Sequence, residues 1–226
     1  MARHADLPVD VEQWSARIAP ERAFWQAGMT VVAGVDEVGR GALAGPLLAA
    51  SVILPPSCLA LDAGEAPWIA RIKDSKLVTP TARTELAAFI AEIADGIGIG
   101  VVDAGELDAI GVAAANRLAM ERAVLALPRP PCALLLDAAV TDLGLPQVGI
   151  IDGDATCLSI AAASIVAKVT RDRLMMECHQ RDDRYGFDQH KGYGTALHLA
   201  ALRQHGPCAL HRRSFAPVAE AVRALQ

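Results

Sequence analysis

Short apolar runs, separated by turns rich in glycine and proline, alternate with longer helix-compatible stretches along most of the chain. The short runs predict β-strands at residues 31–35, 47–54, 97–102, 133–136 and 148–151. The longer stretches predict helices at residues 79–94, 104–126 and 158–180. Thr79 is expected to cap the first of these helices, and Gly111 to interrupt the second. A leading hairpin followed by strand–helix alternation predicts an α/β domain around a central mixed sheet flanked by helices.

The same pattern divides the chain into three segments. We expect residues 1–28 to form an N-terminal extension with a short helix, residues 29–180 the main domain, and residues 181–226 a small C-terminal helical segment. Residues 55–70 carry the proline, glycine and alanine spacing that is typical of a surface loop. The sequence contains no internal repeat or heptad pattern, which favours a monomer.

Composition narrows the classes of protein to consider. Of the 226 residues, 53% are hydrophobic, yet no apolar run reaches the roughly 18 residues of a membrane span. The N-terminus lacks the apolar segment of a secretory signal, so we expect a cytoplasmic protein with no membrane partner. The five cysteines are widely spaced and contain no Cys-x-x-Cys pair, which argues against a zinc knuckle and against a disulfide framework.

Charge is unevenly distributed along the chain, although the net charge is only −5. Residues 1–167 carry 11 basic and 20 acidic side chains, whereas residues 168–226 carry 10 basic and 6 acidic side chains and five of the six histidines. A local basic face, rather than the total charge, steers phosphates towards a protein. The C-terminal segment is therefore compatible with nucleic-acid binding, and equally with the solvated side of an ordinary helix.

Asp36 and Glu37 follow the first predicted strand and lead into the turn Gly39-Arg40-Gly41. Neighbouring side chains of a strand point to opposite faces, so we expect a bend or bulge where the two acids meet one target. The two glycines supply that freedom and let a ligand approach the backbone. Carboxylates suit hard cations, while arginine and free amides suit phosphate or sugar oxygens. The combination predicts metal-assisted chemistry on a nucleic acid.

Asp137 ends a later predicted strand, and Asp154 follows another. Ligands gather at the carboxyl ends of strands, so these acids would share one crevice with Asp36 and Glu37 if their strands are neighbours. Converging acids repel one another unless divalent cations hold them, and all-oxygen ligation favours Mg²⁺ or Mn²⁺ over zinc. Two such ions about 3.5–4 Å apart would support in-line phosphodiester hydrolysis without a general-base side chain. Capping of a turn by Asp137, and of the long helix by Asp154, are the structural alternatives.

Several sequence blocks together resemble the ribonuclease HII family, the bacterial type 2 ribonucleases H. They occur in the family's order over residues 31–218 and comprise Asp36-Glu37-Val38-Gly39-Arg40-Gly41, Asp74-Ser75-Lys76, Asp137, Gly153-Asp154, residues 162–172, His190-Lys191-Gly192-Tyr193-Gly194-Thr195 and His211-Arg212-Arg213-Ser214-Phe215. The resemblance implies an RNase H-like fold, Mg²⁺ or Mn²⁺ as cofactor, and cleavage of the RNA strand of RNA–DNA hybrids. It also implies nicking on the 5′ side of single ribonucleotides in duplex DNA, leaving a 3′-hydroxyl and a 5′-phosphate.

Carried over by position, the resemblance assigns the catalytic, metal-binding acids as Asp36, Glu37, Asp137 and Asp154. Asp172 is a weaker contender for the fourth place, because an ion pair with Lys168 one helical turn earlier is an adequate structural explanation. The C-terminal segment, residues 181–226, is expected to complete the substrate cleft.

The resemblance also implies how the substrate is bound. The backbone of Gly39, Arg40 and Gly41 is expected to sense the 2′-hydroxyl, the group that marks RNA, and Tyr193 to stack against the sugar that follows. A half-buried tyrosine of the core is the alternative for Tyr193. The predicted phosphate contacts, each with a solvated surface role as its alternative, are Lys76, Lys168, Lys191, Arg212 and Arg213.

Two neighbours of these blocks carry weaker expectations. His211 stands beside two arginines and is expected to be structural. Ala138 follows Asp137 where family members usually have glycine, which should slightly restrict the turn while leaving the acid intact.

Two other functions stay open at the level of the sequence. One is a general metal-dependent nuclease of the same fold that does not select the 2′-hydroxyl, and the other is a non-catalytic module that binds hybrids. The Gly-Arg-Gly turn and Tyr193 argue against the first. The cluster of acids argues against the second, because a mere binder of polyanions gains nothing from concentrated negative charge.

Overall fold

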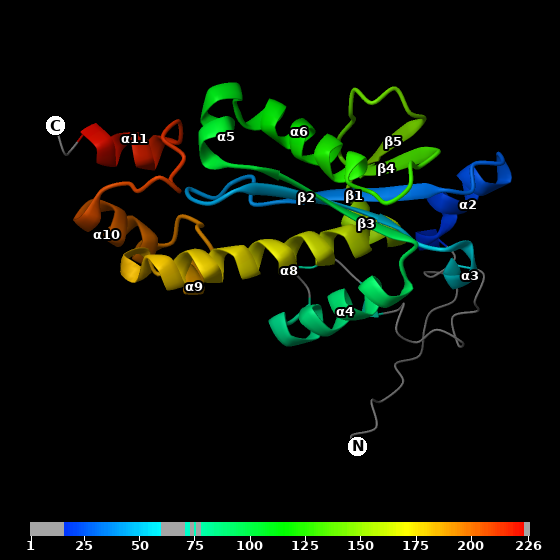
Figure 1. Cartoon of the computed structure of the whole chain (residues 1–226), viewed down its shortest axis with the longest axis horizontal. Coiled ribbons are helices and arrows are strands. Elements are labelled where there is room, and N and C mark those ends of the chain that lie inside the picture. The colour runs from blue at the N-terminus through cyan, green and yellow to red at the C-terminus, as the bar shows by residue number, and fades with distance from the viewer. Residues whose placement is uncertain (1–15, 60–70, 73–74, 76–77, 224–226) are drawn as a thin grey trace, which may run out of the picture.

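A five-stranded mixed sheet forms the centre of the computed structural model, which describes residues 16–59, 71–72, 75 and 78–223 (Figure 1). The strand order across the sheet is β3-β2-β1-β4-β5. The strand bounds are Val32–Val38 (β1), Leu47–Ile53 (β2), Gly96–Val102 (β3), Ala133–Asp137 (β4) and Gln147–Ile150 (β5). β1 pairs antiparallel with β2 and parallel with β4, β2 pairs antiparallel with β3, and β4 pairs parallel with β5. The predicted hairpin and mixed sheet are confirmed.

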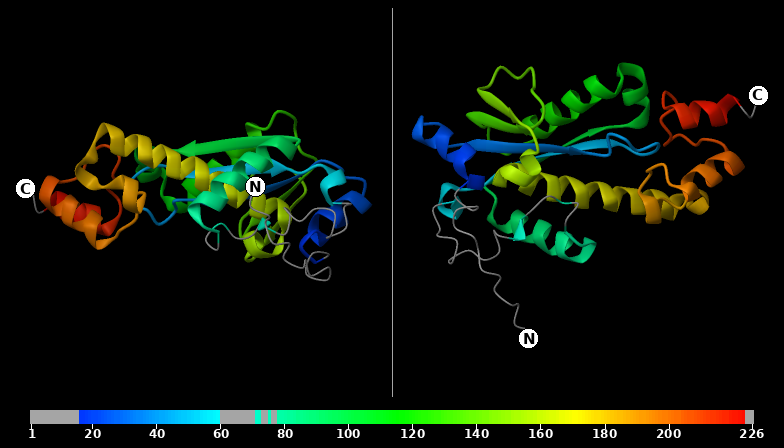
Figure 2. Two further views of the ribbon diagram at one scale, coloured as in Figure 1. Left: turned by 90° about the horizontal axis from the view of Figure 1, so that it is seen from below. Right: turned by 180° about the vertical axis from the view of Figure 1, so that it is seen from behind.

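Helices cover both faces of this sheet. Their bounds are Ala19–Gln26 (α2), Pro56–Leu59 (α3), Pro80–Ile93 (α4), Ala104–Ile110 (α5), Val112–Leu125 (α6), Gly153–Thr156 (α7), Leu158–Arg181 (α8), Asp183–Tyr185 (η3), Phe187–His190 (α9), Ala196–His205 (α10) and Ala216–Arg223 (α11). α5 and α6 lie on one face, α8 crosses the other, and α4 lies outside α8 (Figures 1 and 2). None of the described helices is long and apolar enough to cross a membrane.

Small residues allow the helices to approach the sheet closely. A Cβ at Gly34 of β1 would lie 2.2 Å from the carbonyl carbon of Ser159 in α8. A Cβ at Gly100 of β3 would lie 1.9 Å from the carbonyl oxygen of Ala119 in α6. One apolar layer therefore forms between the sheet, α8 and α4, and another between the sheet and α6. β1 and β2 are buried almost throughout, as expected for central strands covered on both sides.

The predicted elements agree with the structure except at a few boundaries. Thr79 caps α4 by accepting a hydrogen bond from the N–H of Ala82 at 3.4 Å, and Gly111, with φ of +81°, separates α5 from α6. The short helix of the N-terminal extension is α2. The predicted loop at residues 55–70 begins with the helix α3, and residues 60–70 lie outside the described part of the chain.

The C-terminal helices gather at one end of α8, beside the turn that joins β1 to β2 (Figures 1 and 2). Tyr185 and Phe187 form a small apolar cluster there with Met175 of α8. In α11, Val218 packs against Leu43 of the turn. Because β1 ends at this turn, the C-terminal segment lies next to the strand end that carries the first two acids.

Candidate active site

Three carboxylates converge at the carboxyl ends of the neighbouring parallel strands β1 and β4. Asp36 and Glu37 belong to β1, and Asp137 is the last residue of β4. One carboxylate oxygen of each residue lies within 4.8 Å of the other two. The carboxyl ends of adjacent parallel strands meet at the same edge of a sheet, which explains why residues so far apart in sequence lie together.

The two adjacent acids meet without the bulge that the sequence led us to expect. β1 pairs with β2 in unbroken register through both positions. Ser164 of α8 acts on the pKa of Asp36 from one face, and Asn116 of α6 acts on that of Glu37 from the other. Pairing with β4 ends at Val35, so the edge of β1 beyond that residue is open on this side. Both side chains reach the open edge from opposite faces, which makes a bulge unnecessary.

Burial and mutual repulsion oppose full ionisation of the cluster. Asp36 is 5% exposed, and burial, followed by the charge of Glu37, raises its pKa well above the ordinary value, against a hydrogen bond from Ser164. Burial and then the charge of Asp137 raise the pKa of Glu37, while Arg40, at 3.9 Å, opposes this rise. A divalent cation relieves such repulsion, and ligands that are all oxygen suit Mg²⁺ or Mn²⁺. The donor set therefore fits a divalent metal site.

Asp154 directly follows Gly153, the residue that is hydrogen-bonded to Asp137, but Asp154 is not part of the three-carboxylate group. It is buried in α7 directly after Gly153, whose N–H donates to Asp137 Oδ1 at 2.8 Å. The alternative that Asp154 caps the long helix is wrong, because Asp154 lies within α7 and the N-cap of α8 is Cys157. The N–H of Ser159 in the first turn of α8 donates to Glu21 Oε1 at 2.9 Å. The assignment of Asp154 as the fourth acid stays a prediction.

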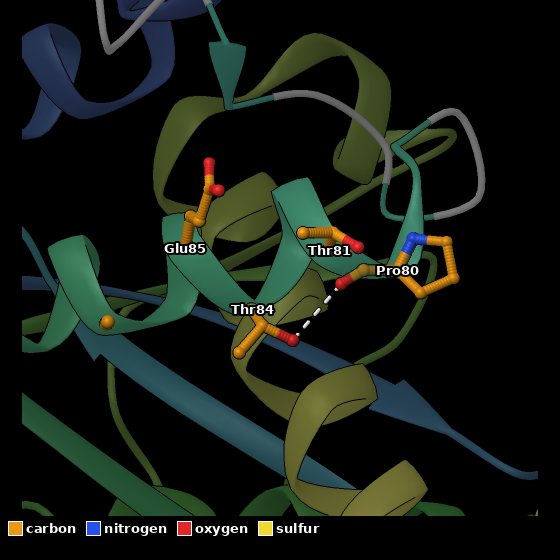
Figure 3. Close-up of a pocket in the computed structure, with 5 residues that line it drawn as sticks. Pro80, Thr81, Thr84 and Glu85 are labelled. Carbon is orange, nitrogen blue, oxygen red and sulfur yellow. Dashed lines mark hydrogen bonds between the residues drawn. The ribbon is translucent and has the colours of Figure 1, made fainter. Parts of the chain in front are cut away.

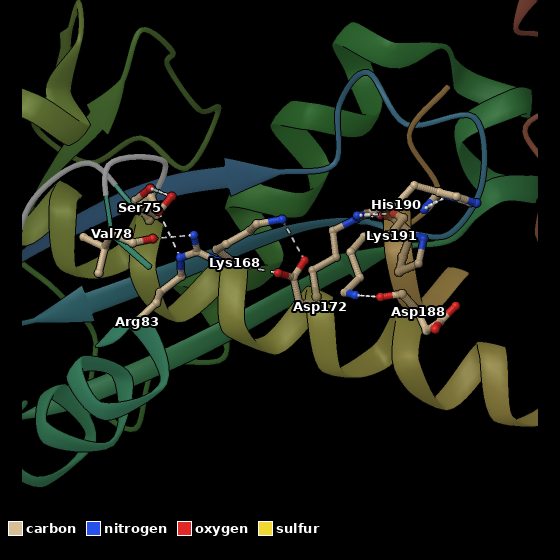
Figure 4. A network of polar contacts seen from close by, with 12 residues as sticks. Ser75, Val78, Arg83, Lys168, Asp172, Asp188, His190 and Lys191 are labelled. Carbon is tan, nitrogen blue, oxygen red and sulfur yellow. Dashed lines mark hydrogen bonds and ion pairs between the residues drawn. The ribbon is translucent and has the colours of Figure 1, made fainter. Parts of the chain in front are cut away.

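Asp172, the weaker contender, is held by two cations (Figure 4). Lys168 Nζ donates to Oδ1 at 2.7 Å, and Arg83 Nη1 lies 3.6 Å from Oδ2. Arg83 is itself anchored on the carbonyls of Ser75, at 2.9 Å, and Val78, at 2.8 Å. The ion pair with Lys168 that would explain Asp172 structurally is confirmed.

The three acids open into a cleft of about 450 Å³ that they share with the predicted substrate-reading residues. These residues are Gly39, Arg40, Gly41, Lys168 and Tyr193. The cleft therefore combines side chains from β1, β4, α8 and the C-terminal segment, and so unites the elements that were expected to bind metal with those expected to bind RNA.

A second hollow, of about 490 Å³, lies on the exposed side of α4 (Figure 3). Its lining comes from α4 alone and comprises Pro80, Thr81, Thr84, Glu85 and Ala88. The Thr84 hydroxyl donates to the carbonyl of Pro80 at 3.1 Å, within the same helix. Because this hollow brings no side chains together from separate elements, it is not a candidate active site.

The two glycines of the Gly-Arg-Gly turn have different surroundings. Gly39 has a φ of +86°, and a Cβ there would lie 2.2 Å from Nε of Arg171. A Cβ at Gly41 would meet no heavy atom within 4 Å. Arg40 between them has 64% of its side chain exposed. Gly39 is thus required by the packing of the turn, whereas Gly41 leaves room for a ligand to approach the backbone.

Tyr193 faces the same cleft from the C-terminal segment. Its half-buried ring lies with its centroid 5.7 Å from Lys168 Nζ and 5.4 Å from Arg171 Cζ. The carbonyl of the preceding residue, Gly192, accepts a hydrogen bond from the N–H of Leu43 at 2.8 Å. A main-chain hydrogen bond therefore joins the turn after β1 to the segment that carries Tyr193.

The predicted phosphate contacts occupy different positions. Lys168 lines the cleft, whereas the ammonium of Lys191 donates to the carbonyl of Asp188 (Figure 4). Arg213 is exposed, and Lys76 lies outside the described residues.

Arg212 is not available to a phosphate, which corrects its prediction as a substrate contact. Its side chain is fully buried, with 0% exposed. The guanidinium donates twice to the carbonyl of Gly45, at 3.0 and 3.1 Å, and once to that of Arg40, at 3.0 Å. Arg212 therefore holds the turn after β1 from the inside.

Arg171 has a similar role that was not predicted. It is also 0% exposed, and it donates to the carbonyls of Pro46 at 2.9 Å, Lys191 at 2.8 Å and Ala44 at 3.1 Å. One guanidinium thus joins the turn after β1 to the segment that carries Tyr193. The absence of a side chain at Gly39 is what makes room for it, because a Cβ there would collide with Nε of Arg171.

Comparison with solved structures assigns the fold. The chain is similar to the crystal structure of the ribonuclease H2 from Pyrococcus horikoshii OT3, with a TM-score of 0.70 and 24% identity, covering 85% of this chain and 97% of that chain. It is also similar to Bst-RNase HIII in complex with Mn²⁺, with a TM-score of 0.62 and 20% identity, covering 90% of this chain and 73% of that chain. The sheet and its helices therefore define an α/β protein of the RNase H-like class.

Comparison of sequences narrows this class to one family. The family model described as Ribonuclease HII matches residues 33–218. A ribonuclease HII from Dehalococcoides mccartyi is 47% identical over 201 residues, which are 88% of this chain and 92% of that protein. The chain belongs to the ribonuclease HII family, and it is a ribonuclease H.

Proposed function

We propose that this chain cleaves the RNA strand of RNA–DNA hybrids and also nicks duplex DNA on the 5′ side of a single embedded ribonucleotide. One observation carries the proposal: the three carboxylates at the ends of β1 and β4 share a cleft with Gly39, Gly41 and Tyr193. The products are a 3′-hydroxyl and a 5′-phosphate. Membership of the ribonuclease HII family supports the hybrid as a substrate.

Asp36, Glu37 and Asp137 are the residues that would hold two divalent cations, Mg²⁺ or Mn²⁺, with Asp154 as the fourth ligand. The all-carboxylate donor set supports this, as does Bst-RNase HIII, which has the same fold and has been crystallised in complex with Mn²⁺. When bound, such ions activate the attacking water and stabilise charge on the leaving oxygen. The chain itself holds the ligands in place: Gly153 N–H fixes Asp137, and Glu37 N–H donates to Asp36 Oδ1 at 2.7 Å.

The backbone of Gly39, Arg40 and Gly41 reads the 2′-hydroxyl in this proposal. The open space at Gly41 supports it, because a sugar oxygen can approach the main chain there without meeting a side chain. Tyr193 stacks on the sugar that follows the ribonucleotide. Lys168, which lies beside the Tyr193 ring and lines the same cleft, contacts a phosphate and positions the duplex without reading sequence. Lys191 and Lys76 extend this set.

The two competing functions are less well supported. A general nuclease of this fold has no use for a turn whose Gly41 leaves the backbone open beside the acids, or for Tyr193 in the same cleft. A hybrid-binding module without activity has no use for three clustered carboxylates that repel both one another and a polyanion.

A cleavage assay separates the three functions. The substrates are a labelled DNA duplex with one ribonucleotide and an all-DNA duplex of the same sequence, each with Mg²⁺ or Mn²⁺. We expect a nick in the first duplex only, and none from Asp36→Asn. Asp142→Asn is the matched control, because Asp142 has 75% of its side chain exposed and pairs with Arg117. Equal cutting of both duplexes would support the general nuclease, and binding without cutting would support the module.

A further inference from the structure

Three buried histidines lie beneath the segment that carries Tyr193, and the proposed cleavage uses none of them. His190 ends α9, His198 lies in α10 and His211 precedes α11, with exposed fractions of 8%, 0% and 2%. Buried imidazoles need a partner at each ring nitrogen, because an unpaired polar group is costly to bury. All three rings have such partners, so the expectation that His211 is structural agrees with its surroundings.

His198 and His211 form a hydrogen-bonded chain with a single direction. The N–H of Cys208 can only donate, and it lies 3.1 Å from Nδ1 of His211, which therefore accepts. The carbonyl of Tyr193 can only accept, and it lies 3.0 Å from Nδ1 of His198, which therefore donates. A neutral imidazole carries one N–H, so Nε2 of His211 donates to Nε2 of His198 across 3.1 Å. The chain thus begins at the Cys208 amide and ends at the Tyr193 carbonyl.

The backbone of Tyr193 depends on this chain because it belongs to no regular element. Its N–H donates to the carbonyl of His190 at 2.9 Å, and its carbonyl also accepts the N–H of Thr195 at 2.8 Å. The preceding Gly192 has a left-handed φ of +86°. Thr195 then caps α10 by accepting the N–H of His198 at 3.3 Å. His198 therefore fixes both ends of the short link between Tyr193 and α10.

We propose that His198 and His211 are positioning residues for Tyr193, which act through its backbone carbonyl and set the place of its ring in the cleft. This inference rests on the proposed function, in which the ring lies against a sugar at the ribonucleotide. A misplacement of about 1 Å can lower a rate about a hundredfold. A long hybrid offers a 2′-hydroxyl in every register, whereas a single ribonucleotide offers one, so the loss of positioning affects the single-ribonucleotide substrate more.

Protonation would break this chain at its centre. A protonated imidazole carries an N–H on both nitrogens, so two N–H groups would face each other across the 3.1 Å between the Nε2 atoms. Burial lowers the pKa of His211 to about 4, and burial also lowers the pKa of His198. The pair is therefore neutral at neutral pH, and the chain is lost as the pH falls towards the lowered pKa values.

The groups around the pair come from four segments of the chain. His190 of α9 stacks on His198 with ring centroids 4.4 Å apart, and Tyr185 of η3 lies 4.7 Å from the ring of His211. Asp182, which directly follows α8, raises the pKa of His211 by its charge, while His190 lowers it. The Cys208 thiol lies 3.2 Å from Nδ1 of His211. Burial outweighs the charge of Asp182, so the direction for His211 is downward.

Paired substitutions separate the hydrogen-bond donor from the bulk of the ring. His211→Gln keeps a donor near the Nε2 position, and His198→Asn keeps one near the Nδ1 position, whereas His211→Leu and His198→Leu keep neither. The readout is kcat and KM on a duplex with one ribonucleotide, each divided by its value on a long hybrid. Urea unfolding shows that each variant is folded. His205→Leu, an exposed position on the same helix α10, is the matched control.

We expect the leucine variants to lower the kcat ratio at least about fivefold with little change in the KM ratio, as for a lost buried hydrogen-bond partner. The Gln and Asn variants should recover most of this loss, and His205→Leu should show none. Leucine variants that are folded and keep the wild-type ratio would overturn the proposal.

A pH profile supplies a second test that needs no leucine variant. The metal-binding acids titrate with both substrates, so the ratio of the two rates cancels their effect. In the wild-type chain we expect the ratio to hold near neutral pH and to fall as the pH approaches the lowered pKa of His211, about 4, and His211→Gln to flatten that fall. A ratio that does not change with pH would overturn the proposal. Failure of the proposed function is distinguishable from failure of the histidine proposal, because the wild-type chain itself would then not nick a single-ribonucleotide duplex. The proposed role of the histidines would then also be wrong.

Discussion

Asp36 and Glu37 are adjacent in β1 and contact helices on opposite faces of the sheet, yet their carboxylates lie within 4.8 Å of each other. The pairing of β1 with β4 stops at Val35, so both side chains reach round an unpaired strand edge. Asp137 meets them there because it ends the shorter strand. The unequal lengths of two neighbouring parallel strands thus create the acidic site.

Removal of one of these carboxylates should stabilise the metal-free protein. Burial and the charge of Glu37 raise the pKa of Asp36 above its ordinary 3.8, so the folded state binds a proton that the unfolded state has released, and stability falls as the pH rises above that value. We expect Asp36→Asn to raise the Tm in EDTA at neutral pH and to lose the increase in Tm that Mg²⁺ gives the wild type. Thermal unfolding with and without Mg²⁺ measures both effects. A variant less stable than the wild type in EDTA would contradict the electrostatic argument.

Two substitutions decide which residue is the fourth acid. Asp154→Asn is expected to reduce cleavage about 10- to 100-fold, with a higher Mg²⁺ requirement. Asp172→Asn should keep the metal dependence and lose about 1–3 kcal/mol of unfolding free energy, because Lys168 and Arg83 are left without their carboxylate. The Mg²⁺ dependence of the rate and urea unfolding measure these outcomes. The reverse pattern would assign the fourth place to Asp172.

Alanine at the two glycines of the turn should have different consequences. At Gly39, a φ of +86° and a contact of 2.2 Å with Arg171 make Gly39→Ala destabilising by about 2 kcal/mol or more. At Gly41 no heavy atom lies within 4 Å of a Cβ, so Gly41→Ala should change stability by less than about 0.5 kcal/mol. The same methyl group would occupy the approach of the 2′-hydroxyl, so nicking at a single ribonucleotide should fall. Urea unfolding and the nicking rate test the pair, and a folded Gly41→Ala with full activity would argue against reading by this turn.

Ala138, directly after Asp137, holds the chain in a left-handed conformation with φ of +43°. This agrees with the expectation that alanine at this position restricts the turn. A left-handed backbone costs a non-glycine residue roughly 1–2 kcal/mol. Replacement by glycine removes this cost, but only part of it is recovered as stability, because glycine has more conformational entropy in the unfolded state. Ala138→Gly is therefore expected to raise the free energy of unfolding by about 0.5–1 kcal/mol. The matched Ala138→Val should lower it, and the opposite order of the two variants in urea unfolding would contradict the argument.

Salt dependence of binding should distinguish a phosphate contact from an internal anchor. Lys168→Gln, in an inactive Asp36→Asn background, is expected to reduce the slope of log affinity against log salt by about 1. Arg212→Lys should leave that slope unchanged and lower the Tm, because an ammonium cannot serve the Gly45 and Arg40 carbonyls as the planar guanidinium does. A reduced slope for Arg212→Lys would restore Arg212 as a phosphate contact.

The features that were predictable from sequence are local ones. Thr79 and Gly111 act on their own helices. The apolar runs that precede Asp36 and Asp137 identify each strand together with the acid at its end, because the strand and its acid are neighbours in sequence. Short-range patterns of this kind are enough to indicate the strands, the helices and the strand ends at which acids meet.

The features that were missed depend on residues distant in sequence. The open edge at Asp36 exists because pairing with β4 stops, which no pattern within β1 reveals. Arginine is usually a surface residue, so the sequence does not indicate that Arg171 and Arg212 are buried. Carbonyls of the turn after β1, rather than a nearby carboxylate, accept the hydrogen bonds of their buried guanidinium groups. Glu21 of α2 likewise caps α8 from far along the chain. Contacts between side chains and distant main-chain groups leave no local signature.

Mapping the ends of the cut strand shows whether the chain nicks DNA on the 5′ side of a single ribonucleotide. The wild-type chain is incubated with Mg²⁺ and a duplex that contains one ribonucleotide, and the products are compared with those of the same duplex carrying 2′-deoxy and 2′-O-methyl nucleotides at that position. We expect a single nick on the 5′ side of the ribonucleotide, with a 3′-hydroxyl and a 5′-phosphate, and no nick in the other two duplexes. Cuts at other positions, or equal cutting of the deoxy duplex, would contradict the proposed function.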